Sequence, residues 1–236
     1  MDLESGRCRH QLQEHLAATL AHELRTPLAS ILTDLHLMRD DLDEATARQT
    51  RERTERQARH MARIIDDVLD ICRCQGGKLC LRKERVDLGA VIDRALESAG
   101  PRLATRRHYL TVSMPQEPVW LLADESRLIQ ILTNLLTNAA RYTEPGGDIR
   151  LLVEATDGVL VVRVRDNGIG IAPGELPHIF EMLRQGERPG IRGPGGLGIG
   201  LAVVKSLVEL HGGTIEALSE GPGTGSEFVI RLPNDA

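Results

Sequence analysis

One apolar stripe near the start of the chain constrains its fold more than any other feature. Between Leu12 and Leu42 the apolar residues recur at gaps of four and three, at positions 12, 16, 20, 24, 28, 31, 35, 38 and 42. This spacing puts them on one face of a long helix. A second helix is predicted over Ala45–Cys74, so the two form an antiparallel hairpin. Because a lone hairpin cannot bury both stripes, we predict a homodimer with a four-helix bundle.

The second helix begins in a strongly basic run. Its arginines lie at positions 48, 51, 53, 56, 59 and 63, interrupted by Glu52 and Glu55. We interpret this run as a solvated helix face. With 29 Lys and Arg against 34 Asp and Glu, the mildly acidic chain is not expected to bind nucleic acid.

Gln75-Gly76-Gly77-Lys78 breaks the helical pattern and divides the chain into domains at 1–75 and 76–236. In the second domain, strands are predicted at Leu79–Arg85, Tyr109–Met114, Val119–Ala123, Asp148–Glu154, Val159–Asp166, Thr214–Leu218 and Gly225–Arg231. Helices are predicted at Leu88–Leu103, Glu125–Arg141 and Gly200–His211. This mixture indicates an α/β sandwich, and the α+β class for the whole chain.

The apolar stretches are too short to cross a membrane. The longest uncharged one, Leu128–Ala140, includes Asn134 and Asn138. The N-terminus has no signal-peptide core, so we expect a soluble cytoplasmic chain without direct membrane contact. The four cysteines lack paired zinc spacing and are predicted to be reduced thiols without a metal role.

A histidine, a glutamate and a threonine form a reactive patch on the first helix. His22 lies about 200° around the helix from Leu20 and Leu24, so its imidazole is predicted to face solvent with Thr26. Glu23 is adjacent, and a carboxylate that accepts the proton of one ring nitrogen makes the other more nucleophilic. The alternative is an ordinary exposed helical histidine.

Three later segments have the residue types of a nucleotide site. Asn134, Asn138 and Arg141 recur at helical spacing as one polar stripe. Asp166-Asn167-Gly168-Ile169-Gly170 directly follows a β-branched strand, where glycines permit close backbone approach. Gly195–Leu201 opens a helix whose N–H groups can meet phosphate. A dinucleotide fingerprint would need a strand directly before it, whereas the Gly/Pro-rich stretch Gly186–Pro194 indicates a mobile lid.

In their order along the chain, these segments resemble the sensor histidine kinase core, and in particular the kinase modules of hybrid histidine kinases. Ile179–Arg184 resembles the phenylalanine box of that family, with Leu183 where a second aromatic is usual, and Gly223–Gly225 resembles its final glycine box. The resemblance implies a dimerisation and histidine phosphotransfer hairpin. It also implies an ATP-binding sandwich of the histidine kinase, gyrase, Hsp90 and MutL type.

The resemblance also assigns roles to residues of this chain. His22 becomes the phosphoacceptor, Glu23 assists autophosphorylation, and Thr26 serves dephosphorylation of the partner. Asn138 becomes a Mg²⁺ ligand, and Asp166 accepts a hydrogen bond from adenine. The other implied contacts to ATP are Asn134, Arg141, Tyr142, Gly168, Gly170, Arg184, Gly196, Gly198, Gly200, Leu201 and Thr224.

The predicted function is ATP-dependent phosphorylation of His22, followed by transfer to an aspartate of a response-regulator receiver domain. Phosphatase activity on that partner is also predicted. One alternative is a conformational ATPase of the gyrase and Hsp90 type, but such enzymes carry an acidic residue in the asparagine helix, and Gln130–Arg141 has none. The other is a catalytically silent dimer scaffold.

Overall fold

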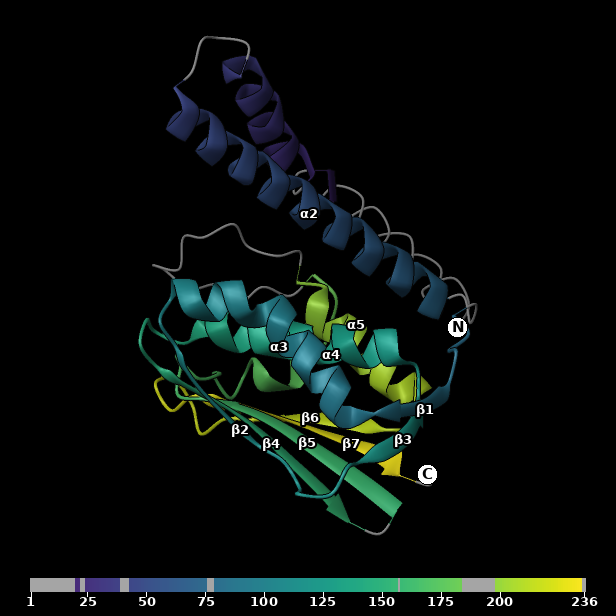
Figure 1. The fold of residues 1–236 in the computed structure, drawn as a ribbon. Coiled ribbons are helices and arrows are strands. Elements are labelled where there is room, and N and C mark those ends of the chain that lie inside the picture. Colours follow the sequence, from purple (N-terminus) through teal and green to yellow (C-terminus); the bar gives the residue numbers. More distant parts are fainter. Residues whose placement is uncertain are drawn as a thin grey trace, which may run out of the picture.

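A helical hairpin stands over an α/β body in the computed structural model (Figure 1). The model describes residues 20–21, 24–38, 43–75, 79–156, 158–183 and 198–234. Residues 20–21 and 24–37 are helical, and α2 spans Glu44–Gln75. The predicted hairpin followed by an α/β sandwich is therefore confirmed within these ranges. His22 and Glu23 lie outside them.

A buried ion pair sets the register of the hairpin. The Asp34 carboxylate is fully buried and accepts hydrogen bonds from Arg53 Nε, at 2.9 Å from Oδ2, and from Arg53 Nη2. It also accepts from the Thr54 hydroxyl at 3.3 Å. The Arg53 guanidinium lowers the pKa of Asp34. The Arg53 side chain is still 48% exposed, so it belongs to the solvated face as predicted, but it also pairs across the hairpin, which the sequence did not indicate. Elsewhere in the run, Arg59 pairs with Glu55 on the same exposed face.

The body contains a five-stranded sheet in the order β2-β4-β5-β7-β6 (Figure 1). Its strands are β2 Tyr109–Ser113, β4 Asp148–Thr156, β5 Gly158–Asp166, β6 Thr214–Leu218 and β7 Ser226–Asn234. Strands β2 and β4 are parallel, and every other neighbouring pair is antiparallel. A separate ribbon pairs β1, Glu84–Asp87, with β3, Trp120–Ala123. The predicted strand Leu79–Arg85 is thus displaced, because Glu84 is the first residue that pairs with β3.

Three helices cover one face of the sheet: α3 Leu88–Thr105, α4 Glu125–Tyr142 and α5 Gly200–Leu210 (Figure 1). Asp87 caps α3 by accepting from the Gly89 N–H at 3.0 Å, and Asp124 caps α4 by accepting from the Arg127 N–H at 3.3 Å. A short 3-10 turn, η1, spans Leu176–His178. The Asp87 and Asp124 caps begin α3 and α4 where the apolar periodicity predicts.

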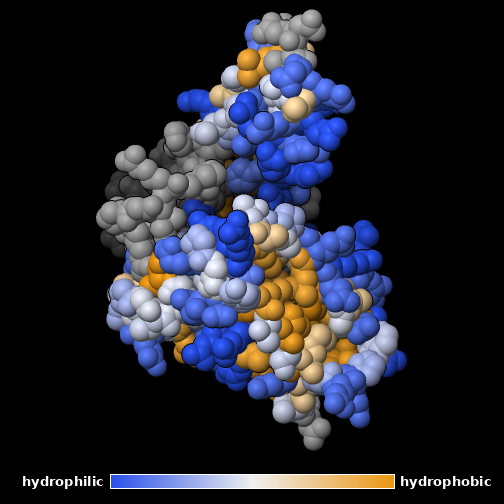
Figure 2. All heavy atoms as spheres, turned by 60° about the vertical axis from the view of Figure 1, so that its left-hand side comes forward, coloured by the Kyte–Doolittle hydropathy of each residue, from blue (hydrophilic) through white to orange (hydrophobic). Residues whose placement is uncertain are grey.

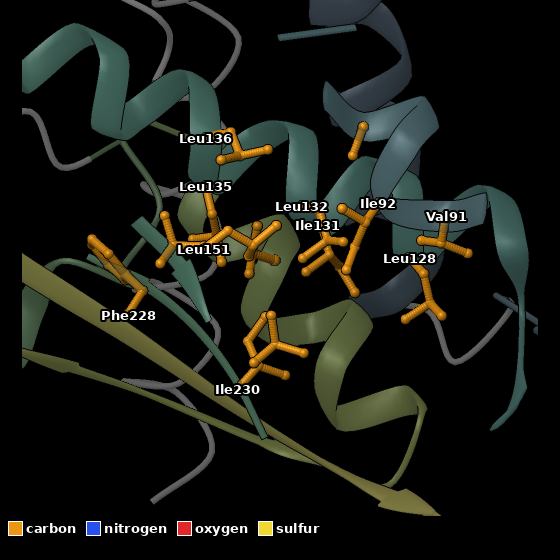
Figure 3. Packing of buried hydrophobic residues seen from close by; sticks show 14 of the residues in the cluster. Val91, Ile92, Leu128, Ile131, Leu132, Leu135, Leu136, Leu151, Phe228 and Ile230 are labelled. Atoms are coloured by element: carbon orange, nitrogen blue, oxygen red, sulfur yellow. The ribbon is translucent and has the colours of Figure 1, made fainter. Parts of the chain in front are cut away.

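The core between the sheet and the helices is almost entirely aliphatic, as the scarcity of aromatics requires. Leu135 and Leu136 of α4 are fully buried, and they lie with Leu151 of β4 and Ile230 of β7 in the view of Figure 3. Burying each such side chain contributes roughly 1.5–3 kcal/mol. One face of α4 is therefore anchored in the core, which leaves its polar stripe in a defined orientation.

The surface is mostly hydrophilic on the hairpin, while the body carries an apolar band. Figure 2, which brings the β2 side of the molecule forward, shows this band between hydrophilic borders. On that edge Tyr109 and Val112 are exposed. Within the described ranges, none of the helices combines the length and apolar character that a membrane crossing requires.

Candidate functional site

The asparagine stripe lies on α4, half-buried, opposite the face that fills the core. Asn134 has a buried Nδ2 with no hydrogen-bond partner, and a side chain added at Gly200 would lie 3.9 Å from the amide of Asn134. The stripe therefore faces the first turn of α5. The Asn138 amide makes no hydrogen bond to another described residue and is only half-buried. Unsatisfied amides in this position suit a polar ligand that accepts and donates hydrogen bonds.

The Asp166 carboxylate is buried at the end of β5 and held in one orientation. Its Oδ1 accepts from the Gly168 N–H at 2.8 Å, and its Oδ2 accepts from the Ser226 hydroxyl at 2.5 Å. Ser226 is directly opposite Asp166 in the antiparallel pairing of β5 with β7. Two donors leave lone pairs on each oxygen for a further donor. A fixed, buried acceptor of this kind can bind selectively a ligand that donates an N–H group to it.

The glycines after β5 permit close contact between three segments of backbone. A Cβ at Gly168 would overlap the Tyr142 carbonyl oxygen, and one at Gly170, where φ is +66°, would overlap the Gly221 carbonyl oxygen. The Ile169 N–H donates to the Tyr142 oxygen at 3.0 Å, and the Gly225 N–H donates to the Gly168 oxygen at 3.0 Å. The end of α4, the turn after β5 and the last glycine turn therefore form one unit.

Thr224 and Tyr142 belong to that unit without reaching Asp166 directly. The Thr224 hydroxyl donates to the Gly221 oxygen at 2.8 Å, which closes the last glycine turn. Tyr142 is partly exposed, and the guanidinium of Arg141 lies 5.4 Å from its ring centroid. This geometry permits a cation–π contact at the end of α4. Tyr142 directly follows the asparagine stripe in sequence, and its carbonyl oxygen contacts the glycine turn after β5.

The phenylalanine segment packs against the sheet, and the predicted lid, Gly186–Pro194, lies outside the described residues. The Phe180 ring contacts the Phe228 ring edge-on, with centroids 6.3 Å apart. Leu183 has a φ of +63°, and its N–H donates to the Gly198 oxygen at 3.1 Å. This bond joins residues on either side of the undescribed segment 184–197, just before Gly200 and Leu201 begin α5. Arg184 and Gly196 lie outside the described residues.

The hairpin carries the remaining predicted residue that can be placed. Thr26 is exposed on the first helix, whereas Pro27, next to it, is buried. Thr26 is thus accessible from solvent, as predicted, but it is not part of the α4–β5 cluster. The structure places Asn134 beside Gly200 and the end of α4 beside the Asp166 turn, and it leaves Thr26 on the hairpin.

Two residues that support the cluster were missed in the sequence. Ser226 orients Asp166, yet 60 positions separate them and only the strand register brings them together. His211 is buried at the end of α5, where its Nε2 accepts from the Asp124 N–H at 3.1 Å and its Nδ1 donates to the Leu207 oxygen at 2.8 Å. Burial lowers the pKa of His211, which favours this neutral form. The His211-Gly212-Gly213 run is the only sequence signal that could have indicated this role.

The chain matches two protein-family models. Residues 12–77 match the His Kinase A (phospho-acceptor) domain, and residues 123–236 match the histidine kinase-, DNA gyrase B- and HSP90-like ATPase. These ranges contain the hairpin and the α4–β5 cluster respectively.

Similar proteins cover nearly the whole chain. Hybrid signal transduction histidine kinase D of Dictyostelium discoideum is 34% identical over 94% of this chain, although this chain spans only 15% of that protein. The mycobacterial sensor histidine kinase MprB is 32% identical with a TM-score of 0.53, over 64% of this chain and 97% of that one. Full-length ShkA in complex with AMPPNP is 30% identical with a TM-score of 0.68, over 94% of this chain and 46% of that one.

Proposed function

Because the chain belongs to the sensor histidine kinases, we propose that it transfers the γ-phosphoryl group of ATP to His22 and then to an aspartate of a receiver domain. The observation that best supports this function is the α4–β5 cluster. In it, the buried Asp166 carboxylate is held in one orientation beside glycine turns in which a Cβ would overlap backbone atoms. The ShkA structure, which contains AMPPNP, supports a nucleotide as the ligand. The same fold family includes ATPases without a phosphoacceptor, so the hairpin distinguishes the two functions.

In the proposed site, Asp166 accepts from the adenine amine while Gly168 and Gly170 allow the backbone to approach the ring. Asn134, Arg141, Tyr142, Gly198, Gly200, Leu201 and Thr224 are assigned to the rest of the nucleotide, with Arg184 and Gly196 from the lid. The amide oxygen of Asn138 suits Mg²⁺, a hard cation that would neutralise phosphate charge when bound. Glu23 would accept the ring proton of His22 and so raise its nucleophilicity.

A labelling experiment tests this function against its two alternatives. The protein is incubated with γ-labelled ATP and Mg²⁺, and both protein-bound label and released phosphate are measured. The proposal requires acid-labile label on the protein, which an added receiver domain removes. Released phosphate without protein label would instead indicate a conformational ATPase, and neither product would indicate a silent scaffold.

The homodimer is proposed from the apolar surface of the single hairpin. Among the described residues, six large apolar side chains of the hairpin are exposed: Leu28, Leu32, Leu35, Leu37, Ile65 and Leu69. Apolar residues gathered on one helical hairpin indicate a partner that covers them. A second copy supplies the same stripe in a four-helix bundle, and this dimer would place two acceptor histidines beside two catalytic domains.

The replacement of Asp166 by asparagine is expected to weaken nucleotide binding about 10- to 100-fold, because a charged acceptor contributes roughly 1.5–3 kcal/mol to such a bond. The asparagine amide would also turn a donor towards either Gly168 or Ser226, both of which already donate. Calorimetric titration with a non-hydrolysable ATP analogue measures the change. Asp148→Asn, at an exposed position on the neighbouring strand β4, is the matched control and is expected to bind normally. Equal affinities for all three proteins would rule out the adenine assignment.

The replacement of Thr26 by alanine is expected to leave labelling of His22 within about twofold, while dephosphorylation of the receiver slows at least about tenfold. Thr26 is exposed and lies four residues after the acceptor, about one helical turn away, so we expect it to orient a water without taking part in the attack on ATP. Loss of receiver phosphate over time, with ADP present, measures the effect. Thr33→Ala is the control, because Thr33 lies two turns along the same face and its hydroxyl bonds only to the Ala29 oxygen. Parallel loss of both activities in Thr26→Ala would contradict this division.

A further inference from the structure

A buried carboxylate joins the hairpin to the catalytic domain. Asp70, near the end of α2, is 3% exposed. One of its oxygens, Oδ2, accepts from Arg127 Nη1 at 2.6 Å and from Gln130 Nε2 at 2.9 Å, both on α4. The same Arg127 nitrogen donates to Gln130 Oε1 at 2.9 Å. Two side chains of the catalytic domain therefore hold a single oxygen of the hairpin.

Apolar contacts surround this polar joint. Ile64, six residues before Asp70 on α2, is 4% exposed and belongs to the same core cluster as α4 and α5, and Val68 packs against that cluster. Helix α2 is also in contact with α5. Figure 1 shows α2 passing over the helical layer of the body. The hairpin thus covers the two helices that carry Asn134 and Gly200.

Hydrogen bonds of Asp124 fix the backbone of Arg127 at the start of α4. The Arg127 backbone N–H donates to the carboxylate of Asp124, the N-cap of α4. The same carboxylate accepts from the Arg82 N–H at 3.0 Å. The Asp124 N–H in turn donates to the buried His211. The first turn of α4 is therefore held firmly in the catalytic domain, so a large displacement of the hairpin would carry Asp70 out of reach of Arg127.

The energetics of a buried ion pair make this contact selective. Its mutual attraction is largely offset by the desolvation of both charges, so an intact pair adds little net affinity. Removal of one partner leaves a buried, unpaired charge, which strongly disfavours the docked arrangement. Apolar contacts tolerate small shifts, whereas this pair does not. Asp70 and Arg127 therefore determine which docked arrangement is populated.

We propose that Asp70, Arg127 and Gln130 form an interdomain latch that holds the catalytic domain in one resting position on its own hairpin. This inference rests on the proposed function, in which one histidine meets first the nucleotide and then a receiver. The catalytic domain must therefore occupy at least two positions, and a contact with a single geometry cannot persist in both. Because α2 covers the nucleotide-binding helices in the latched position, that position is the resting one, and opening the latch precedes transfer.

The test replaces Arg127 with methionine in the full chain, which keeps the unbranched stem and removes the charge. Hydrogen exchange of the α2 amides around Asp70 and of the first turn of α4 is expected to accelerate at least about tenfold, as the docked state loses population. The initial rate of His22 labelling is expected to rise severalfold, with unchanged affinity for a non-hydrolysable ATP analogue. Arg94→Met is the control, because Arg94 pairs with Glu125 at 3.1 Å at the same end of α4 but within the catalytic domain.

A double variant separates the charge effect from damage to the fold. Asp70→Leu combined with Arg127→Met leaves no buried charge, so the slow exchange is expected to return. Unchanged exchange in Arg127→Met, or no recovery in the double variant, would overturn the latch. Faster exchange with slower labelling would overturn its assignment to the resting state. Hydrogen exchange needs no catalytic activity, so these results remain distinct from a failure of the proposed kinase function.

Discussion

Replacing His22 with alanine is expected to abolish acid-labile labelling by γ-labelled ATP, a loss of more than about 10³-fold. An alanine has no nucleophilic atom, and neither Glu23 nor Thr26 can substitute for an imidazole at neutral pH. The nucleotide cluster lies on the other domain, so affinity for an ATP analogue should be unchanged. Filter binding measures the label that remains on each protein after treatment with acid or with alkali. Phosphohistidine loses its label in acid and keeps it in alkali.

The matched control is His36→Ala. His36 is an exposed histidine on the same helix, within the described hairpin, and it is not part of the proposed site. Its labelling should equal that of the unmodified protein. If His22→Ala retained acid-labile label while His36→Ala lost it, the phosphoacceptor assignment would be wrong and the patch around His22 would be an ordinary helix surface.

Replacing Asn138 with alanine is expected to reduce labelling at least about 100-fold, because Mg²⁺ loses a protein oxygen ligand beside the phosphates. Alanine favours helix, and the opposite face of α4 is anchored by buried residues such as Leu135, so the fold and the dimer should persist. The sharper measurement is the affinity for a non-hydrolysable ATP analogue with Mg²⁺ and with a chelator. Asn138→Ala should lose the gain that Mg²⁺ provides and keep the affinity seen in the chelator.

Thr133→Ala is the control for that experiment, because it shortens a neighbouring side chain on α4 whose hydroxyl makes no hydrogen bond. It is expected to retain both labelling and the response to Mg²⁺. A normal Mg²⁺ response in Asn138→Ala would remove the residue from the metal site, and aggregation of that variant would be detected separately by its elution volume.

The sequence predicts best what depends on local periodicity. The 3.6-residue spacing identifies α3, α4 and the hairpin, and the consecutive strands predicted at Asp148–Glu154 and Val159–Asp166 identify the β4–β5 pair, because each pattern is set by neighbours in the chain. The first strand is misplaced since nothing local distinguishes Leu79–Arg85 from β1; only pairing with β3 does so. Short elements defined by a distant partner are therefore the weakest predictions.

The residues of the candidate site likewise differ in whether the local sequence or a distant partner determines their role. Asp166 and its glycines are recognisable because the turn requires them within five residues, whereas Ser226 and Asp70 act on residues about 60 positions away. The exposure of Arg53 follows from the charged pattern of its own helix, whereas its ion pair with Asp34 on the other helix depends on a residue 19 positions away. The roles of His22, Glu23, Arg184 and Gly196 stay predictions, since those residues lie outside the described ranges.

The buried Asp34 also has a mechanical consequence. Sliding of the first helix along α2 by one turn, about 5.4 Å, would separate the carboxylate from Arg53 and strand it without a counter-charge. Relative translation of the two helices is therefore strongly resisted, whereas tilting or rotating the hairpin as a whole leaves the pair intact. An input applied to one end of this hairpin would travel to the other as the motion of a stiff rod.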